Sequence, residues 1–198
     1  ERIKSIKHNN FKKYQHKILG GWLAKAEGVV FENWSIGEFN PDNLQTSCGM
    51  DFGFSIDPDS LTEVAIDKKH KKIYLKEHLY RNGLKSQELA QIILDKVDSK
   101  LIIADSAEPR LIADLKHLGV NIKAVKKGTI ESGITRMQDY HLIVSPESTN
   151  IAKELNNYIF SDKASKLYVD NYNHAIDGIR YNVIYHLDNP NAGRYFVQ

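Results

Sequence analysis

The chain has 198 residues, which is enough for one α/β domain with a buried core. Its apolar fraction of 41% and charged fraction of 26% are those of an ordinary globular protein and exclude a collagen-like, disordered or coiled-coil chain. A net charge of +2 argues against a small DNA-coating polycation, although it leaves room for a local basic patch.

The cysteine content and the hydropathy pattern limit the surroundings of the protein. One cysteine, Cys48, can form neither an internal disulfide nor a cysteine-based zinc site, so a reducing compartment fits. We expect Cys48 to be a small buried residue rather than a nucleophile. No apolar run approaches the roughly 18 residues of a membrane span and no signal peptide is visible, so no membrane partner is expected. Because the chain begins without Met, we expect it to be a fragment of a longer protein.

The first 45 residues differ in character from the rest. Lysines recur through residues 1–25, apolar segments follow, and the turn cluster at 40–43 closes the region. We predict that residues 1–45 are a linker and an edge element that follow a preceding domain. Residues 46–198 are then predicted to form the domain proper.

From residue 46 onward, strand and helix patterns alternate. Three strands with short connections come first and predict an antiparallel meander. Helical spacing over 86–97, with Ser86 as a candidate N-cap, predicts a helix. The apolar run 101–105 has the pattern of a strand buried on both faces. The other strands are predicted at 49–54, 61–66, 72–80, 120–125 and 140–144, and the other helices near 109–118, 130–137, 148–159 and 173–187.

This order of elements predicts the fold class. Three hairpin-like strands, then strand–helix–strand–helix–strand and a terminal helix, are the order of the ribonuclease H fold. Parallel strands joined by helices need right-handed crossovers, which favours a mixed sheet. We therefore predict an α/β fold, a ribonuclease-H-like mixed β-sheet flanked by helices.

Three acidic residues occupy positions where an unpaired carboxylate is costly. Asp51 lies inside an apolar strand, Asp105 ends the buried strand, and Asp177 lies on the terminal helix, so a divalent metal would supply the compensating charge. If their strands are neighbours, Asp51 and Asp105 can meet across roughly 5 Å. His174 precedes Asp177 by three residues, so both project from one helical face, and we expect the row of Asp177 to meet the sheet.

Three carboxylates and one imidazole suit Mg²⁺ or Mn²⁺. Two such ions about 4 Å apart would activate a water and stabilise the leaving oxygen of a phosphodiester. In this hypothesis Asp51 bridges both ions, Asp105 and Asp177 each hold one, and His174 binds an ion or orients a water. Taken one at a time, such acids are more often helix caps or solvated side chains, so these residues alone leave a structural role open.

Three segments together resemble the acidic motifs of the large terminase subunits of tailed bacteriophages. They are residues 48–54, 102–109 and 173–181, which contain the three acids and His174. The earlier segments 19–22 and 27–31 resemble the region that joins the terminase motor to its nuclease. The resemblance covers nearly the whole chain, and the motifs are specific as a set.

The resemblance implies a metal-dependent endonuclease that cuts concatemeric double-stranded viral DNA at the start and end of genome packaging, with little sequence preference. It implies Mg²⁺ or Mn²⁺ as cofactor. Asp51, Asp105 and Asp177 match the metal-binding acids of the family, and His174 matches an additional site residue of some members. The implied catalytic and metal-binding residues are therefore these four.

The resemblance also implies partners and a place of action. The partners are double-stranded DNA and, in the full-length protein, an N-terminal packaging ATPase, the small terminase subunit and the portal. The implied location is the cytoplasm of the infected bacterial host. No Gly-x-x-x-x-Gly-Lys-Ser/Thr loop is present in the sequence, so ATP hydrolysis by this chain is not expected.

Contact with DNA needs cations, and several lysines gather near the predicted strand 120–125. We expect some of them, with an arginine one turn beyond Asp177, to bind phosphates, although each could equally be a solvated charge. Glu108 lies one turn from Asp105 and is a candidate for supporting the site. The candidate DNA-binding residues are Lys123, Lys126, Lys127 and Arg180, with Lys116 nearby.

Three other functions use the same features. Another ribonuclease-H-like nuclease, such as a resolvase, would use the acids equally well. An actin-like ATP-binding domain resembles the turn Asp51-Phe52-Gly53, but it needs two lobes and a second glycine-rich loop. A non-catalytic DNA-binding module would keep the acids without using them, and metal binding distinguishes this alternative from the others.

Overall fold

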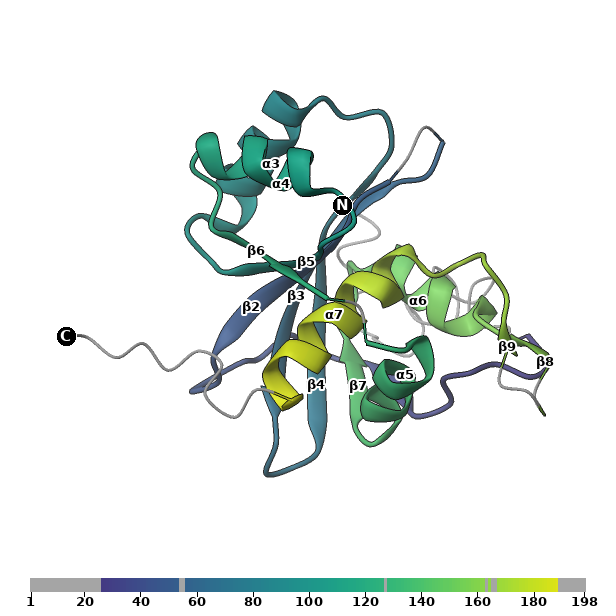
Figure 1. Ribbon diagram of the computed structural model, residues 1–198. Helices are drawn as coiled ribbons and strands as arrows, with labels where there is room; N and C mark the ends of the chain where they lie inside the picture. The colour runs from purple at the N-terminus through teal and green to yellow at the C-terminus, as the bar shows by residue number, and fades with distance from the viewer. Residues whose placement is uncertain (1–25, 54–55, 127, 163, 165–166, 189–198) are drawn as a thin grey trace, which may run out of the picture.

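The computed structural model describes residues 26–53, 56–126, 128–162, 164 and 167–188 (Figure 1). The predictions made for residues 1–25 and for Lys127 lie outside these residues. A seven-stranded sheet forms the centre of the molecule, in the order β1-β7-β4-β3-β2-β5-β6. Its strands are β1 (Trp34–Ile36), β2 (Thr46–Asp51), β3 (Asp59–Asp67), β4 (Lys72–Arg81), β5 (Ile102–Asp105), β6 (Ile122–Val125) and β7 (His141–Val144).

The sheet is mixed, as predicted. β3 runs antiparallel to both of its neighbours, β2 and β4, and this is the predicted meander. The other neighbouring strands of the sheet are parallel to each other. The parallel pairing of β2 with β5 matters most for function, because each of these strands ends at an acidic residue.

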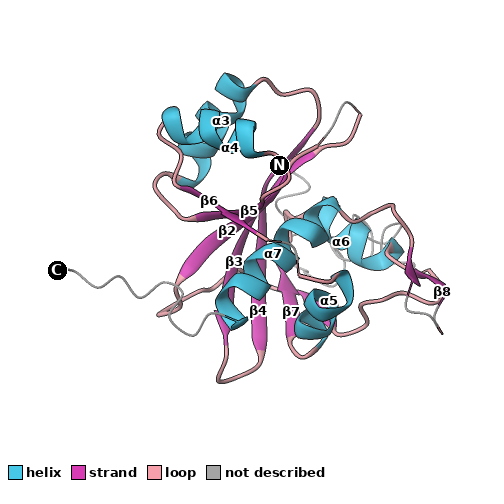
Figure 2. Cartoon of the chain, in the orientation of Figure 1, coloured by secondary structure: helices cyan, strands magenta, loops and turns pink. Residues whose placement is uncertain are grey.

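Helices cover both faces of the sheet (Figure 2). α3 (Ser86–Val97) and α4 (Pro109–His117) pack on one face, over a core that includes Met50, Leu61 and Ile102. α5 (Ile130–Gln138), α6 (Thr149–Asn157) and α7 (His174–Asp188) pack on the other, over Val64, Ile73 and Leu75. A short hairpin of β8 (Phe160–Asp162) and β9 (Leu167–Tyr168) precedes α7. The predicted α/β class, a mixed β-sheet flanked by helices, is confirmed.

Two local predictions differ from the structure. Strand β2 ends at Asp51 rather than continuing to residue 54, because the chain turns there toward β3 and the Gly53 N–H donates to the Asp59 carboxylate. Ser86 is the first residue of α3, and the N-cap position is Lys85.

No helix in the described part of the chain combines the length and apolar character needed to cross a membrane.

Helix α7 is buried along two rows of side chains. Ile176, Ile179 and Val183 lie in the core shared with α5 and α6. The backbone of Gly178 packs directly on that of Gly49 in β2, where an added Cβ on Gly49 would lie 2.0 Å from the Gly178 carbonyl oxygen. The row that contacts β2 is therefore centred on Gly178, one residue beyond the row of Asp177 that we expected there.

Residues 26–36 pack against the rest of the fold. Val30 and Phe31 are buried in the same core as α5, α6 and α7. β1 pairs in parallel with β7 at one edge of the sheet. These contacts give residues 29–36 the character of an edge element, and the division of the chain at residue 45 stays a prediction.

Candidate active site

Asp51 and Asp105 end two adjacent parallel strands. β2 and β5 pair in a register that places Met50 opposite Ala104, and each acid follows by one residue. Neighbouring strands lie about 4.8 Å apart. The two carboxylates therefore leave the sheet side by side at its carboxyl edge.

Both acids also point to the same face of the sheet. Successive side chains of a strand alternate between faces. Met50 points into the core beneath α3 and α4, so Asp51 points the other way, on the side where Gly49 contacts α7. Ala104 lies in the core beneath α3 and α4 as well, so Asp105 also faces the side of α7. The acids of β2 and β5 thus face the helix that carries Asp177.

His174, the first residue of α7, lies between two carboxylates. Its Nδ1 is 3.4 Å from Oδ2 of Asp51, and its Nε2 is 3.7 Å from Oδ1 of Asp57. The hydrogen bond with Asp51 raises the pKa of His174, burial opposes that shift, and the charges of Glu154, Asp51 and Asp57 add to it. The structure therefore brings His174 to Asp51, and it adds Asp57, which we had not singled out.

Asp177 is held by an arginine from its own helix. The Nε and Nη2 of Arg180 both donate to Oδ1 of Asp177 at 3.1 Å. The Arg180 side chain is 1% exposed, because it lies against Gly133 of α5, where a Cβ would come within 2.2 Å of its Cγ. A side chain so buried is not available to a DNA phosphate in this structure. Arg180 thus supplies Asp177 with positive charge, for which we had expected a metal ion.

The three acids act electrostatically on one buried tyrosine. Burial raises the pKa of the Tyr181 hydroxyl, and the charges of Asp177, Asp51 and Asp105 raise it further, while Arg180 lowers it. The acids come from three separate elements, so their shared effect on Tyr181 places them around one region of the molecule.

A further carboxyl group near Asp51 belongs to Asp59, the first residue of β3. Asp59 is buried, and burial raises its pKa to about 6, with the charge of Asp51 adding to the shift and the hydrogen bond from Gly53 opposing it. Protonation of Asp59 at mildly acidic pH would reduce its repulsion with Asp51.

The donor set has the chemistry of a divalent-cation site. Carboxylate oxygens from β2, β5 and α7, with the imidazole of His174, are ligands suited to Mg²⁺ or Mn²⁺. Among the residues that the structure describes, however, no three His, Cys, Asp or Glu side chains converge as a ligand group. The residues fit a cation by type and by face, and a cation at Asp177 would compete with Arg180.

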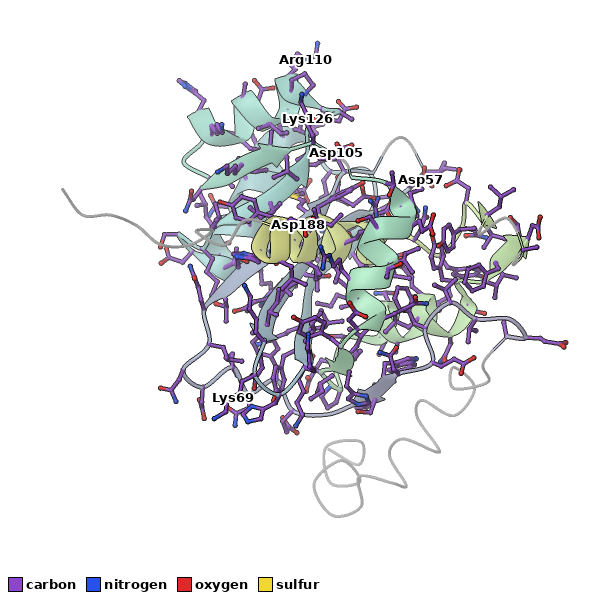
Figure 3. All side chains as sticks on the ribbon, turned by 60° about the horizontal axis from the view of Figure 1, so that its bottom comes forward. Asp57, Lys69, Asp105, Arg110, Lys126 and Asp188 are labelled. Carbon is purple, nitrogen blue, oxygen red and sulfur yellow. The ribbon has the colours of Figure 1, made fainter. Side chains whose placement is uncertain are left out.

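Of the candidate DNA-binding lysines, Lys126 lies at the same end of the sheet as Asp105, and Lys123 lies within β6, opposite Ile103. Lys126 is exposed and follows β6, in which Val125 pairs with Asp105. Lys123 is exposed and donates from Nζ to the Tyr185 hydroxyl at 3.2 Å. Figure 3 shows Lys126 and Asp105 at one end of the molecule, together with Arg110, and Lys69 at the other. Lys116 and Glu108 are exposed on and before α4.

Some features of the site were not predicted, because their signals in the sequence are weak. Asp57 and Asp59 lie in and after the loop that follows β2, where acids are common and no periodicity marks them. The spacing of Asp177 and Arg180 indicates that they are neighbours on a helix, but nothing in it indicates burial. Only the packing of α5 on α7 reveals that.

Comparison with known proteins shows a family for most of the chain. Residues 51–184 match the profile of the family described as terminase RNAseH-like domain. The large terminase subunit of Bacillus phage SPP1 is 34% identical over 202 residues, which cover 91% of this chain and 47% of that protein. The PBSX phage terminase large subunit of Bacillus subtilis strain 168 is 30% identical over 80 residues, covering 40% of this chain and 18% of that protein. The chain thus spans at most about half the length of these relatives.

Solved structures share the fold. The nuclease domain of the SPP1 large terminase g2p, crystallised with bound Mn, has a TM-score of 0.68 and 32% identity and covers 77% of this chain and 96% of that chain. The nuclease domain of the P22 large terminase has a TM-score of 0.67 at 14% identity, covering 79% and 91%. The nuclease of thermophilic phage G20c, with bound magnesium, has a TM-score of 0.56 at 17% identity, covering 80% and 97%. The last two, at low identity, support the fold alone.

Proposed function

Because this chain belongs to the family of terminase RNase-H-like domains, we propose that it is a metal-dependent endonuclease that cuts concatemeric double-stranded viral DNA during genome packaging. The observation that carries the proposal is the placing of Asp51 and Asp105 on adjacent parallel strands, facing the helix of Asp177. The Mn found in the SPP1 nuclease domain supports the use of a divalent cation.

The proposed ligands are Asp51, Asp105 and Asp177, with His174 beside them. Two bound Mg²⁺ or Mn²⁺ ions would supply the chemistry of phosphodiester hydrolysis, by polarising an attacking water and neutralising charge on the leaving oxygen. Asp51 lies beside Asp105 across the β2–β5 pair and 3.4 Å from His174, so its carboxylate would be the ligand common to both sides of the site. The Nδ1 of His174 lies 3.4 Å from Asp51, and its Nε2 faces Asp57 at 3.7 Å, so His174 would be suited to orient a water or move a proton at Nε2.

DNA would approach along the carboxyl edge of β5 and β6. Lys126 lies there, and Lys123 lies within β6, opposite Ile103. Their charges would position phosphates along β6 without reading base sequence. Contacts of this kind fit cutting with little sequence preference.

In the whole protein we propose the partners of a packaging machine. These are an N-terminal packaging ATPase, the small terminase subunit and the portal, acting in the cytoplasm of the infected bacterial host. The relatives that support this are large terminase subunits, and this chain spans less than half of the SPP1 protein.

The direct test is plasmid cleavage with Mn²⁺, Mg²⁺ or EDTA, comparing the chain with Asp51→Ala. Asp95→Ala is the matched control, because Asp95 is exposed on α3, on the opposite face of the sheet. We expect metal-dependent nicking and linearisation that Asp51→Ala reduces by about 100-fold or more and that Asp95→Ala retains.

Circular dichroism establishes that each variant is folded. If the unchanged chain binds neither metal and leaves DNA intact under every condition, the nuclease proposal is wrong and a DNA-binding module replaces it. Cleavage that persists in folded Asp51→Ala would instead remove Asp51 from the site.

A further inference from the structure

Helix α7 receives its N-terminal cap from another helix. The first N–H groups of a helix have no partner within it and are usually satisfied by the residue just before it. Here the side-chain amide of that residue, Asn173, donates to Asp170. The N–H groups of Ala175 and Ile176 donate instead to the carboxylate of Glu154 in α6, at 3.2 and 3.0 Å.

Glu154 is also joined to the sheet. The hydroxyl of Tyr80 in β4 donates to Oε1 of Glu154 at 2.9 Å. The Tyr80 ring meets the ring of His174 edge to face, with centroids 6.5 Å apart. The carboxylate and its tyrosine therefore contact both the backbone of the first turn of α7 and the side chain of His174.

Helix α6, which carries Glu154, is fixed in the same manner. The carboxylate of Glu77 in β4 accepts hydrogen bonds from the backbone N–H groups of Asn150 and Ile151, at 3.1 and 3.2 Å. Two carboxylate caps in series thus connect β4 to α6 and α6 to α7.

The burial of the Glu154 carboxylate is energetically unfavourable in itself. Its residue is 1% exposed, and burial raises its pKa to about 7 while the three hydrogen bonds lower it. Burying an acid is unfavourable unless its oxygens are well satisfied. Here three hydrogen bonds satisfy the Glu154 oxygens, and two of them come from the first turn of α7, which begins at His174.

We propose that Glu154 is a positioning residue for the acidic site, holding the first turn of α7 so that His174 and Asp177 face Asp51 and Asp105. This inference rests on the proposed nuclease function for its consequence in DNA cleavage. Its structural part, the hold of Glu154 on the first turn, is measurable without cleavage.

The test compares Glu154→Ala and Glu154→Gln with Glu63→Ala. Glu63 is a matched control, since it is a buried carboxylate (5% exposed) that accepts a hydrogen bond from His78 away from α7. Glu154→Gln keeps an oxygen that can accept from the helix N–H groups. Tyr80→Phe is a milder variant that removes only the hydroxyl bond to Glu154.

Three readouts follow each variant: hydrogen exchange of the Ala175 and Ile176 amides, Mn²⁺ affinity, and cleavage kinetics. For Glu154→Ala we expect about 10-fold faster exchange at these amides, about 10-fold weaker Mn²⁺ binding, and a kcat lower by about 10- to 100-fold at nearly unchanged KM for DNA. Glu154→Gln should recover kcat to within about 5-fold of the unchanged chain, and Tyr80→Phe should fall between them.

Glu63→Ala should lose stability while keeping kcat and Mn²⁺ affinity. The inference is wrong if folded Glu154→Ala keeps normal exchange at Ala175 and Ile176 and normal Mn²⁺ affinity, or if Glu63→Ala loses as much activity at equal stability. If Glu154→Ala does not fold, Tyr80→Phe decides, and unchanged exchange at Ala175 and Ile176 together with unchanged Mn²⁺ affinity in it would overturn the inference. An unchanged chain that cuts no DNA refutes the proposed function, whereas the exchange measurement still decides the role of Glu154.

Discussion

Replacing Gly49 with alanine should separate the helix that carries Asp177 from the strand that carries Asp51. The new Cβ would lie 2.0 Å from the Gly178 carbonyl oxygen and 2.5 Å from its carbon, whereas ordinary contact begins at 3.4 Å. Both neighbours are backbone atoms, so no side chain can turn away. Helix α7 or strand β2 would have to retreat by about 1.4 Å, the difference between the two distances to oxygen.

A displacement of that size should be larger in its effect on cleavage than on folding. Overpacking a core costs about 1–3 kcal/mol, which for a chain of this length corresponds to about 2–4 °C in Tm per kcal/mol. Misplacing catalytic groups by about 1 Å can cost about 100-fold in rate. We therefore expect Gly49→Ala to remain folded with a lowered Tm and to cut plasmid DNA about 100-fold more slowly.

Gly178→Ala, on the opposite side of the same contact, is the matched comparison. Its Cβ would lie 3.2 Å from the carbonyl group of Gly49 and 3.3 Å from the Asp51 nitrogen, so a shift of a few tenths of an ångström suffices. Alanine also favours a helix interior over glycine by about 1 kcal/mol, which offsets the crowding. We expect less than about 10-fold loss in rate.

Thermal unfolding and single-turnover plasmid cleavage in Mn²⁺ measure the two effects separately. Equal cleavage rates for Gly49→Ala and the unchanged chain, at unchanged Tm, would refute the close backbone packing of α7 on β2. A larger loss in cleavage rate for Gly178→Ala than for Gly49→Ala would contradict the expectation that the closer of the two contacts is the more disruptive.

Three further predictions address the charged residues. Arg180→Met keeps the apolar stem against Gly133 but removes the guanidinium from Asp177, and we expect it to lower the free energy of unfolding by about 3 kcal/mol, the lower end for a broken buried pair because Asp177 is 17% exposed. Urea unfolding measures this, and unchanged stability with weakened DNA binding would restore the phosphate contact first expected. Lys123→Ala and Lys126→Ala should each weaken DNA binding and reduce the slope of log K against log salt by about 1, measured by fluorescence anisotropy at several salt concentrations, with no change in Tm. An unchanged slope would remove that lysine from the DNA path. Burial, followed by the charge of Lys68, lowers the pKa of His186 from 6.5 to about 4, so the unfolded chain binds a proton between these values that the folded chain does not. The contribution of neutral His186 to the free energy of unfolding is therefore fully present above pH 6.5 and is lost as pH falls toward 4. His186→Gln can still accept a hydrogen bond from Ser47 but cannot titrate. The stability of this variant relative to the unchanged chain should therefore rise as pH falls from 6.5 toward 4. Parallel curves of unfolding free energy against pH would contradict the lowered pKa of His186.

The arrangement of the sheet was predictable because strand patterns are local. Alternation and turn residues marked β2, β3 and β4, and the continuous apolar run marked β5 and its end at Asp105. Asp51 was predicted within the first of these strands, which in the structure ends at that residue. The position of Asp177 on the terminal helix and the three-residue spacing of His174 marked these two residues, and the family resemblance joined them with Asp51 and Asp105 as a set. The structure confirms the fold, and the metal ligands stay a prediction.

The contacts that shape the site were not predictable, because they join residues that no local pattern relates. His174 and Asp57 meet through a loop whose only signal is its acidity, and Glu154 reaches α7 from another helix. Arg180 could be paired with Asp177 from their spacing, but its burial depends on the absence of a side chain at Gly133 in α5. Such features need the packing of helices on one another, which sequence periodicity does not describe.

The docking of α7 on β2 also bears on when the acidic region can exist during synthesis. His174 and Asp51 are separated by 123 residues of chain, so the region closes through one of the longest loops the domain contains. Loop closure of this kind comes late and slowly in folding, and chains fold from the N-terminus as they are made. Strands β2 and β5 can pair while α7 is still inside the ribosome, and the acids at their ends then face solvent. A chain whose synthesis stops before α7 would therefore retain much of the sheet and lack the assembled site.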